Sequence, residues 1–299
     1  MKTENYLSKI IEDLNHYGFS SSNVNEILDE SEMKYFEEIL AFYSESLKNA
    51  KVKERIQEIN NHITPANSKY KQYEITHDEM LNEPLTLDNL PLIKLYLSKN
   101  FLKIAKSYLG QDVKIRNPLA WIHPAAKNKK EIRSQKWHRD QEDYKMLKVF
   151  ILFSNVNENN GPTQYIKGTN FSGKHKNIAP NMTWTKDHWS NKNKLLKKVY
   201  NLIREKIPYN YPLPKHNIVK ATGKIGTIFF IDTNGLHKGG QVKDGIRLLT
   251  HCNYLRESAP MLKKGMPLEK LNVDEKLFSF DYNSKTFKSF DSNIQKMLI

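Results

Sequence analysis

Apolar residues recur every three or four positions in the first third of the chain, a spacing that places them on one face of a helix. The clearest case is "EMKYFEEILAFYSESLKNA", which follows two candidate N-terminal caps, Asp29 and Ser31. Charged residues fill much of the opposite face, so the apolar stripe predicts packing against a core. The stripe consists of Met33, Phe36, Leu40, Tyr43 and Leu47.

A second helical stretch is expected over residues 88–110. The polar segment 60–80 between the two stretches indicates a loop. Gly110 stands directly after the last apolar position, where a glycine commonly ends a helix. Residues 1–110 are therefore expected to be mostly helical.

The pattern changes after residue 110 to short runs of β-branched and aromatic residues between turn signals, which predict strands. The sequence has no GxGxxG or P-loop pattern for binding nucleotides. Strands that follow one another without helices favour an antiparallel sandwich or barrel. The expected strand regions are 112–124, 146–156, 225–235 and 246–255, with a turn and a short strand over 157–168.

A basic segment, residues 183–220, interrupts the strands with nine Lys or Arg and two Asp or Glu. It contains "NKNKLLKKVYNLIREKI", which predicts an amphipathic helix over the sheet. It could be a solvated surface helix, or a cover on the substrate opening that attracts acidic groups. Residues 258–299 are expected to form a C-terminal extension, and the whole chain 1–299 a single domain with its core over 111–257.

Lysine and arginine exceed aspartate and glutamate by 47 − 33 = 14 charges. Such a charge can attract acidic partners, but abundant lysine and asparagine can also reflect an AT-rich genome. The sequence shows no signal peptide and no stretch long enough to span a membrane. Its one cysteine, Cys252, can form no internal disulfide, which fits a reducing compartment and predicts a cytoplasmic protein.

His138 and Asp140 lie one residue apart in "QKWHRDQ", and His237 follows a strand and a turn far along the chain. Two imidazoles and one carboxylate on one face of an ion leave the other positions open, as in non-haem Fe(II) oxygenases. Zinc enzymes also use two histidines and a carboxylate, so this ligand set is compatible with iron and with zinc.

Arg247 follows His237 by ten residues, beyond the Gly-rich segment "KGGQVKDG". This segment predicts a hairpin that returns Arg247 on the neighbouring antiparallel strand. There its guanidinium could pair with the distal carboxylate of an iron-chelating 2-oxo acid. Lys148 shares a strand face with Phe150, and if that face lines the barrel, Lys148 is expected to bind an anionic group of the co-substrate or substrate.

Other polar and aromatic residues are expected near the mouth of the barrel and are weaker candidates for substrate contact. They are Asn117, Trp121, Gln135, Arg139, Tyr144 and Gln164. Several histidines have no ligand-like spacing to the predicted metal site and are interpreted as bystanders. They are His123, His175, His188, His216 and His251.

The chain resembles the phytanoyl-CoA dioxygenase family of Fe(II)/2-oxoglutarate oxygenases. The resemblance rests on "WHRDQEDYKMLKVFILFSNVNENNGPTQYIKGTN" and "GTIFFIDTNGLHKGGQVKDGIRLLTHCNY", with "LNHYGF" and "IAKSYLGQDVKIRN", and covers most of residues 12–257. It implies a double-stranded β-helix, a jelly-roll barrel behind N-terminal helices. The chain departs from the family at Gly168-Thr169-Asn170, where Gly-Ser-His is common.

The resemblance implies that His138, Asp140 and His237 bind iron and that Arg247 binds 2-oxoglutarate, with O2 as the other co-substrate. Halogenating relatives lack the carboxylate, so Asp140 argues for hydroxylation or a related oxidation. The expected function is hydroxylation of a small organic molecule with release of succinate and CO2, and the lysine-rich insert favours an anionic one.

Three alternative functions fit parts of the sequence. A nucleic-acid demethylase would use the basic charge, but the "NGPTQYIKG" segment is typical of the small-molecule family. A zinc hydrolase would use the same three ligands, but it gives Arg247 no role. A non-catalytic jelly-roll binding protein would usually have a broken ligand set. The sequence specifies neither the substrate nor the oligomeric state.

Overall fold

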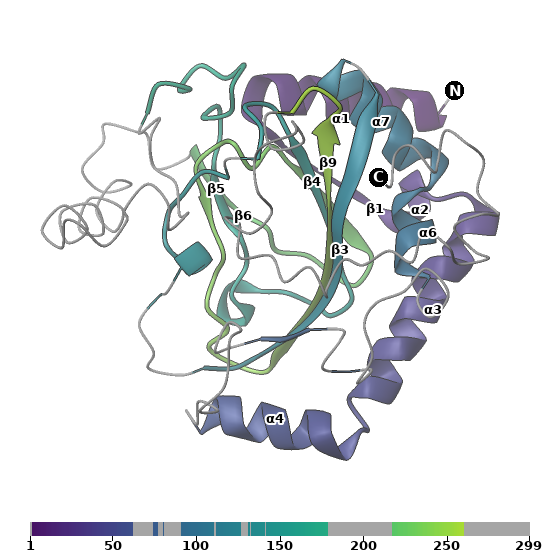
Figure 1. Ribbon diagram of the computed structural model, residues 1–299, viewed down its shortest axis with the longest axis vertical. Coiled ribbons are helices and arrows are strands. Elements are labelled where there is room, and N and C mark those ends of the chain that lie inside the picture. The colour runs from purple at the N-terminus through teal and green to yellow at the C-terminus, as the bar shows by residue number, and fades with distance from the viewer. Residues whose placement is uncertain are drawn as a thin grey trace, which may run out of the picture.

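Two antiparallel sheets form the centre of the computed structural model of this protein (Figure 1). The structure describes residues 2–61, 74–76, 80, 91–110, 112–126, 131, 133–140, 142–178 and 217–259. The large sheet has six strands in the order β1-β7-β4-β9-β3-β2, and the small sheet has three in the order β6-β5-β8. The strands are β1 Phe19–Asn23, β2 Ile75–Thr76, β3 Val113–Pro124, β4 Leu147–Leu152, β5 Gln164–Ile166, β6 Ile218–Lys220, β7 Thr227–Ile231, β8 His237–Lys238 and β9 Ile246–Arg256.

The fold is the expected double-stranded β-helix. From β4 onward the chain passes between the sheets, so that β4 pairs with β7 in the large sheet while β5 pairs with β8 in the small one. Side chains alternate along each strand, and one face of each sheet therefore points into the space between them. A buried cluster fills that space, with Leu152, Tyr165, Phe229, Ile231 and Leu249 among its members.

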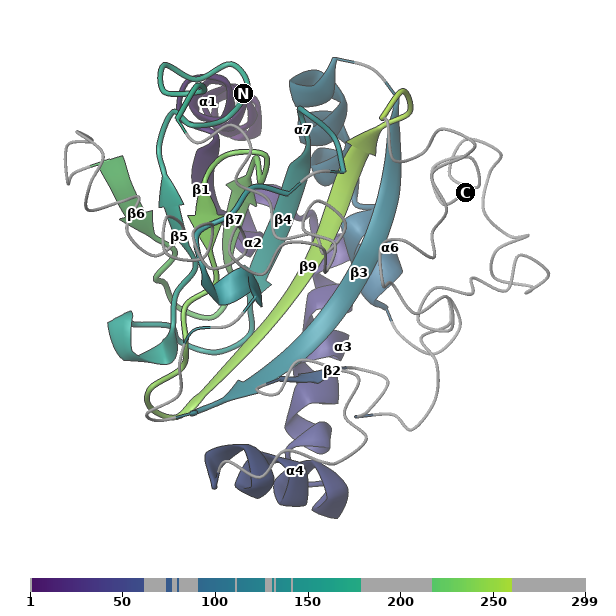
Figure 2. The same ribbon diagram turned by 60° about the vertical axis from the view of Figure 1, so that its left-hand side comes forward.

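Helices cover the outer face of the large sheet (Figures 1 and 2). A continuous apolar core joins them to the strand residues that point away from the small sheet, among them Val149, Phe230 and Cys252. Cys252 is buried there, as expected of a small side chain. The helices are α1 Lys2–Tyr17, α2 Val24–Ile27, α3 Glu30–Ser46, α4 Ala50–Asn60, α6 Leu92–Tyr96 and α7 Lys99–Leu109.

The boundaries of the helices follow the predicted signals. Asp29 caps α3 in a capping box, in which its side chain accepts from the backbone N–H of Glu32. Ser31 is not the cap, since its hydroxyl donates to the carboxylate of Asp29. Gly110 ends α7 in the left-handed conformation with a φ of 75°, which favours glycine. Within the described stretches, no helix is long and apolar enough to cross a membrane.

Two predicted boundaries differ from the structure. The expected loop over 60–80 contains the short strand β2, which pairs with β3 near its end. The basic segment expected as a helical insert over 183–220 ends in a strand, because β6 completes the small sheet beside β5. Both short strands depend on partners far along the chain, which local periodicity cannot show. The predicted helix within 183–216 and the extension after residue 259 lie outside the described residues.

Tyr43 anchors α3 to the two longest strands of the large sheet. Its hydroxyl donates to the carbonyl of Leu249 at 2.7 Å and accepts from the backbone N–H of Trp121 at 3.0 Å. Tyr43→Phe is expected to lower the free energy of unfolding by about 1–3 kcal/mol, because both buried backbone groups lose a partner. Urea denaturation measures the loss, and an unchanged unfolding midpoint would show that the hydroxyl contributes nothing.

Candidate metal centre

Backbone pairing brings His138, Asp140 and His237 together. His138 and His237 form an isolated antiparallel bridge and exchange two backbone hydrogen bonds, of 2.9 and 3.0 Å. The backbone N–H of Asp140 donates to the carbonyl of Thr233, in the turn that precedes His237. The spacing of the three side chains is therefore set by main-chain geometry.

Arg247 does not return beside His237 as the sequence predicted. His237 belongs to β8 in the small sheet, whereas Arg247 belongs to β9, which pairs with β3 and β4 in the large sheet. The Gly-rich segment between them crosses from one sheet to the other and is not a hairpin. The prediction was wrong because glycines indicate a turn but not the sheet that the next strand joins.

The two imidazoles turn their Nε2 atoms toward the carboxylate of Asp140. The distances to its oxygens are 3.5 Å from His138 and 3.8 Å from His237. The Nδ1 atoms lie 2.7 Å from the carbonyl of Lys136 and 2.9 Å from that of Gly235. A carbonyl accepts only, so Nδ1 carries the proton and each Nε2 keeps a lone pair that can bind a metal.

The electrostatics keep the ligands in the form that binds metal. Burial, and the repulsion that two protonated rings at His138 and His237 would have, lower the pKa of His237 to about 3, so its imidazole is neutral at physiological pH. Burial would raise the pKa of Asp140, but the charge of Lys148, with the interactions of the two histidines, outweighs it and holds the pKa well below its usual value. Asp140 is therefore an ionised carboxylate.

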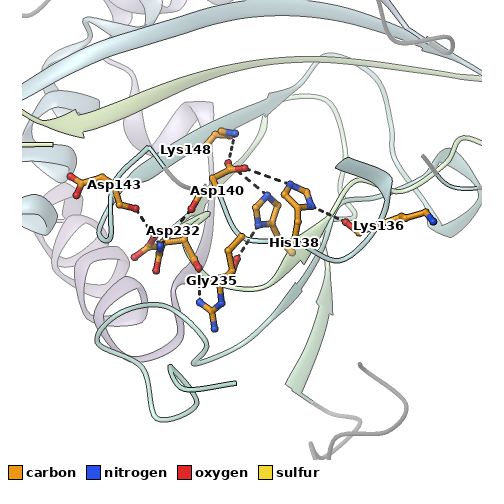
Figure 3. Close-up of polar contacts among 10 residues, drawn as sticks. Lys136, His138, Asp140, Asp143, Lys148, Asp232 and Gly235 are labelled. Atoms are coloured by element: carbon orange, nitrogen blue, oxygen red, sulfur yellow. Dashed lines mark hydrogen bonds and ion pairs between the residues drawn. The ribbon is translucent and has the colours of Figure 1, made fainter. Parts of the chain in front are cut away.

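Lys148 makes an ion pair with one of these ligands. Its ammonium donates to Oδ2 of Asp140 at 2.8 Å, while the other oxygen of that carboxylate faces His138 (Figure 3). Lys148 thus points inward, but the anion that it meets is the candidate ligand Asp140 and not a group of the co-substrate or substrate. The contact fixes the carboxylate rotamer and leaves Asp140 one oxygen toward His138, which is the arrangement that a monodentate metal ligand needs.

The donor set fits a divalent iron ion. One ligand atom from each of the three residues lies within 4.8 Å of the others, and all three residues are buried. Two nitrogens and one oxygen would bind one side of an ion, and the chemistry of such a set leaves room for a chelating co-substrate and O2. In the stretches that the structure describes, no other such group of histidine, cysteine and carboxylate residues occurs.

Arg247 lines an apolar cavity between the sheets. The other lining side chains include Phe150, Leu152, Phe229 and Leu249. Arg247 is 5% exposed, and its Nε and Nη1 have no hydrogen-bond partner among the described residues. Burial lowers its pKa to about 10, so the guanidinium remains charged. A buried cation with unused donors is costly unless an anion pairs with it, which fits the distal carboxylate of 2-oxoglutarate.

Two of the weaker candidates for substrate contact, Arg139 and Tyr144, interact with other parts of the protein. The guanidinium of Arg139 donates to four backbone carbonyls, which favours a role in holding loops over one in binding substrate. Tyr144 is 46% exposed, and its ring lies against the guanidinium of Arg256. The four carbonyls that Arg139 contacts belong to Thr169, Asn234, Lys176 and Ile178.

The remaining candidates are divided between the interior and the surface. Trp121 faces the interior, where its ring packs on His251 with centroids 4.5 Å apart. Gln164 faces away from the space between the sheets, because its neighbour Tyr165 fills that space. Gln135 is half-buried in a short 3-10 helix. Asn117 lies where the register of β3 shifts, and its side chain is outside the described residues.

Sequence reasoning missed the inward-facing residues of β9. His251 and Asn253 lie four and six positions after Arg247, so strict alternation puts all three on the inner face. His251, interpreted from sequence as a bystander, packs between Trp121 and Phe150. Counting alternate positions from Arg247 would have found it.

The other histidines interpreted as bystanders are not part of the metal centre in the described residues. Nε2 of His123 lies 3.3 Å from the carboxylate of Glu74. Nε2 of His175 lies 3.2 Å from the amide nitrogen of Asn217. Two more lie outside the described residues, His188 and His216.

Thr169 and Asn170, which stand where the family commonly has Ser-His, make local hydrogen bonds. The Thr169 hydroxyl accepts from the backbone N–H of Leu236 at 2.8 Å and donates to the carbonyl of Ile166. The Asn170 amide donates to the carbonyl of Leu14 in α1. Both residues are buried, so this turn links α1 to the residue before the candidate ligand His237.

Asp232 sits behind the turn that precedes His237. Its carboxylate accepts from the hydroxyl of Tyr108 at 2.6 Å and from the backbone N–H of Asn234 at 3.1 Å. Burial outweighs these bonds and raises the pKa of Asp232 from 3.8 to about 6. The folded protein therefore binds this proton more tightly than the unfolded chain does.

This shift predicts a pH-dependent stability. The stabilisation from protonated Asp232 is fully present below about pH 4 and is lost as the pH rises through about 6. We expect the unfolding free energy of the wild type to fall by about 3 kcal/mol relative to Asp232→Asn between pH 4 and pH 7. Urea denaturation of both proteins from pH 4 to pH 7.5 tests this, and parallel pH profiles would contradict it.

One protein family matches this chain in sequence, and several solved structures match it in fold at low sequence identity. The family model described as phytanoyl-CoA dioxygenase (PhyH) matches residues 39–247. No curated protein matches. The matched span includes all three candidate metal ligands and Arg247.

Several solved structures are similar at low identity. The α-ketoglutarate-dependent epimerase SnoN from nogalamycin biosynthesis is 14% identical, with 86% of this chain and 83% of that chain covered and a TM-score of 0.49. The carbocyclase SnoK is 12% identical, with 87% of each chain covered and a TM-score of 0.49. EctD from S. alaskensis, solved with 2-oxoglutarate and 5-hydroxyectoine, is 16% identical over 84% of this chain and 77% of that chain, with a TM-score of 0.48.

Proposed function

This chain belongs to the phytanoyl-CoA dioxygenase family, and we propose that it acts as an Fe(II)/2-oxoglutarate-dependent hydroxylase of a small organic molecule. The observation that carries the proposal is the buried group of His138, Asp140 and His237, together with a buried Arg247 whose Nε and Nη1 lack partners among the described residues. A zinc hydrolase would leave that guanidinium unexplained.

Each residue has a defined task in this reaction. His138, Asp140 and His237 would hold the iron, and their backbone pairing fixes the spacing of the three side chains. Arg247 binds the distal carboxylate of 2-oxoglutarate, and the apolar lining around Phe150 and Leu249 excludes water from it. Bound iron and 2-oxoglutarate supply the oxidation itself, in which O2 is consumed and succinate and CO2 are formed.

The carboxylate of Asp140 argues against halogenation and for hydroxylation or a related oxidation. Asp140 would take one coordination position of the ion, and Lys148 holds its carboxylate at 2.8 Å. No place is then left for a halide that could be transferred to the substrate. A cytoplasmic location is part of the same proposal, since the lone cysteine Cys252 is buried and forms no disulfide.

The decisive experiment is anaerobic loading with Fe(II) followed by 2-oxoglutarate. We expect a visible charge-transfer band, and after O2 is admitted with a panel of substrates, succinate together with a product that has gained one oxygen atom. Iron binding without a band would contradict the 2-oxoglutarate assignment. A band and succinate with a product that gains no oxygen would retain the oxygenase and reject the hydroxylase.

A further inference from the structure

A polar row crosses three strands of the large sheet beside the metal ligands. Asn253 of β9 lies directly opposite Arg116 of β3 on one side and Lys148 of β4 on the other. Residues directly opposite each other in adjacent strands point to the same face of a sheet. Lys148 reaches Asp140 from this face, so the whole row is turned toward the metal centre.

Asn253 contributes a buried acceptor that no described residue uses. The residue is 1% exposed, and its side-chain oxygen has no hydrogen-bond partner within the described stretches. Buried polar atoms are almost always hydrogen-bonded, because an unmet donor or acceptor is costly. This oxygen is therefore complementary to a ligand that carries an N–H or O–H group.

Lys148 and Arg116 add positive charge on either side of that amide. The Lys148 ammonium has three N–H groups, and Asp140 is its one hydrogen-bond partner in the described part of the chain. Arg116 is half-buried, and burial lowers the pKa of its guanidinium without removing the charge. Two cations in one line match an oxyanion, most simply a carboxylate.

Glu142 provides a second acceptor next to the row. Burial and the charge of Asp140 raise the pKa of its carboxyl, while the charges of Lys148 and Arg116 act in the opposite direction. A ligand that presents a carboxylate to Lys148 and Arg116 could therefore donate an amine or hydroxyl to Asn253 or Glu142. The row as a whole is complementary to a molecule that carries both kinds of group.

The row is too far from Arg247 to bind the same end of one small molecule. Asn253 follows Arg247 by six residues on one strand, which corresponds to about 20 Å along β9. 2-Oxoglutarate anchored at Arg247 would extend toward the metal and end there. The row lies farther along the strand, where a second molecule would meet the metal centre.

We propose that Arg116, Lys148 and Asn253 form a substrate subsite for a small amino or hydroxy acid, in which the two cations bind the carboxylate and the amide oxygen accepts from the amine or hydroxyl. This inference rests on the proposed oxygenase function. It narrows the substrate from any small organic molecule to an acid with a neighbouring hydrogen-bond donor. The adjoining carbon chain would then lie beside the metal.

The test uses the anaerobic complex of the whole protein with Fe(II) and 2-oxoglutarate. Its charge-transfer band reports on a molecule that binds beside the iron. The probes are L-leucine, L-phenylalanine and 2-hydroxyhexanoic acid, each compared with its own primary amide and with the acid that lacks the amine or hydroxyl. At least one probe is expected to perturb the band with a Kd at least about tenfold lower than those of both its analogues.

Two variants test whether residues of the row cause the preference for the carboxylate and the preference for the amine or hydroxyl. Arg116→Met is expected to weaken binding of the acid about tenfold and to remove its preference over the primary amide. Asn253→Leu should instead remove the preference for the amine or hydroxyl, because the acceptor is gone. Both should retain their affinity for Fe(II) and 2-oxoglutarate. Lys224→Met, which removes an exposed cation elsewhere, should leave every constant unchanged.

Two results would overturn the proposal while the oxygenase stands. One is a normal band that no probe perturbs at a lower Kd than its analogues. The other is a set of preferences that survives in Asn253→Leu and Arg116→Met variants with wild-type thermal unfolding. Absence of the band from the wild type would instead reject the proposed function, and this inference with it.

Discussion

Asp140→Ala is expected to abolish oxygenase activity and to weaken Fe(II) binding at least about a hundredfold. The variant loses the carboxylate ligand and also strands the ammonium of Lys148, which has Asp140 as its partner at 2.8 Å. A cation left unpaired beside two imidazoles repels a divalent ion and destabilises the fold. Competition with a coloured chelator measures the iron affinity, and succinate release measures the activity.

A double variant separates these two effects. In Asp140→Ala with Lys148→Met the stranded charge is gone, so the thermal stability lost in the single variant should be largely recovered. Iron affinity should stay low, because the ligand is still missing. Wild-type iron affinity in either variant would mean that Asp140 is not a ligand, and the metal site would have to be reassigned.

Arg247→Met is expected to raise the Kd of 2-oxoglutarate roughly a hundredfold and to leave Fe(II) affinity unchanged. The guanidinium is buried and lines an apolar cavity, where a charge-assisted pair with a carboxylate is strong. The charge-transfer band should therefore reach the wild-type intensity only at much higher 2-oxoglutarate. Titration of the anaerobic Fe(II) protein measures the shift.

A truncated co-substrate provides the matched control. 2-Oxobutyrate keeps the keto acid that chelates iron but lacks the distal carboxylate. The wild type should bind it far more weakly than 2-oxoglutarate, and Arg247→Met should bind the two about equally. The apoprotein should lose little stability, since Nε and Nη1 of Arg247 have no described partner to lose. A variant that still prefers 2-oxoglutarate would place its distal carboxylate elsewhere.

The predicted element types were most accurate where the signal is local. The stripe and caps of α3 and the glycine that ends α7 follow from residues within one or two turns, and the structure has them at the expected positions. The short strands β2 and β6 were missed for the opposite reason. Each is stable only because a distant strand supplies the hydrogen bonds that two or three residues cannot provide alone.

For the candidate site too, some features were predictable from local sequence and others were not. The HxD spacing, the later histidine and the arginine are properties of the sequence, and they were enough to select His138, Asp140, His237 and Arg247. Which sheet each one occupies was not predictable, as the crossing of the chain from β8 to β9 shows. Turn residues specify a change of direction, but the choice of sheet depends on which strands are already paired.

By itself, the sequence of this protein determined the candidate ligand types, their order and the family pattern, because the chemistry requires particular side chains at particular spacings. Only the tertiary structure decided that Lys148 pairs with Asp140, that Arg139 holds loops, and that Asn253 stands in a row with Arg116. The pairing of Asn253 with Arg116 depends on register between strands more than a hundred residues apart, and the other two contacts depend on how loops pack beside the sheets. Register is set by the packing of the whole barrel, and no local pattern carries it.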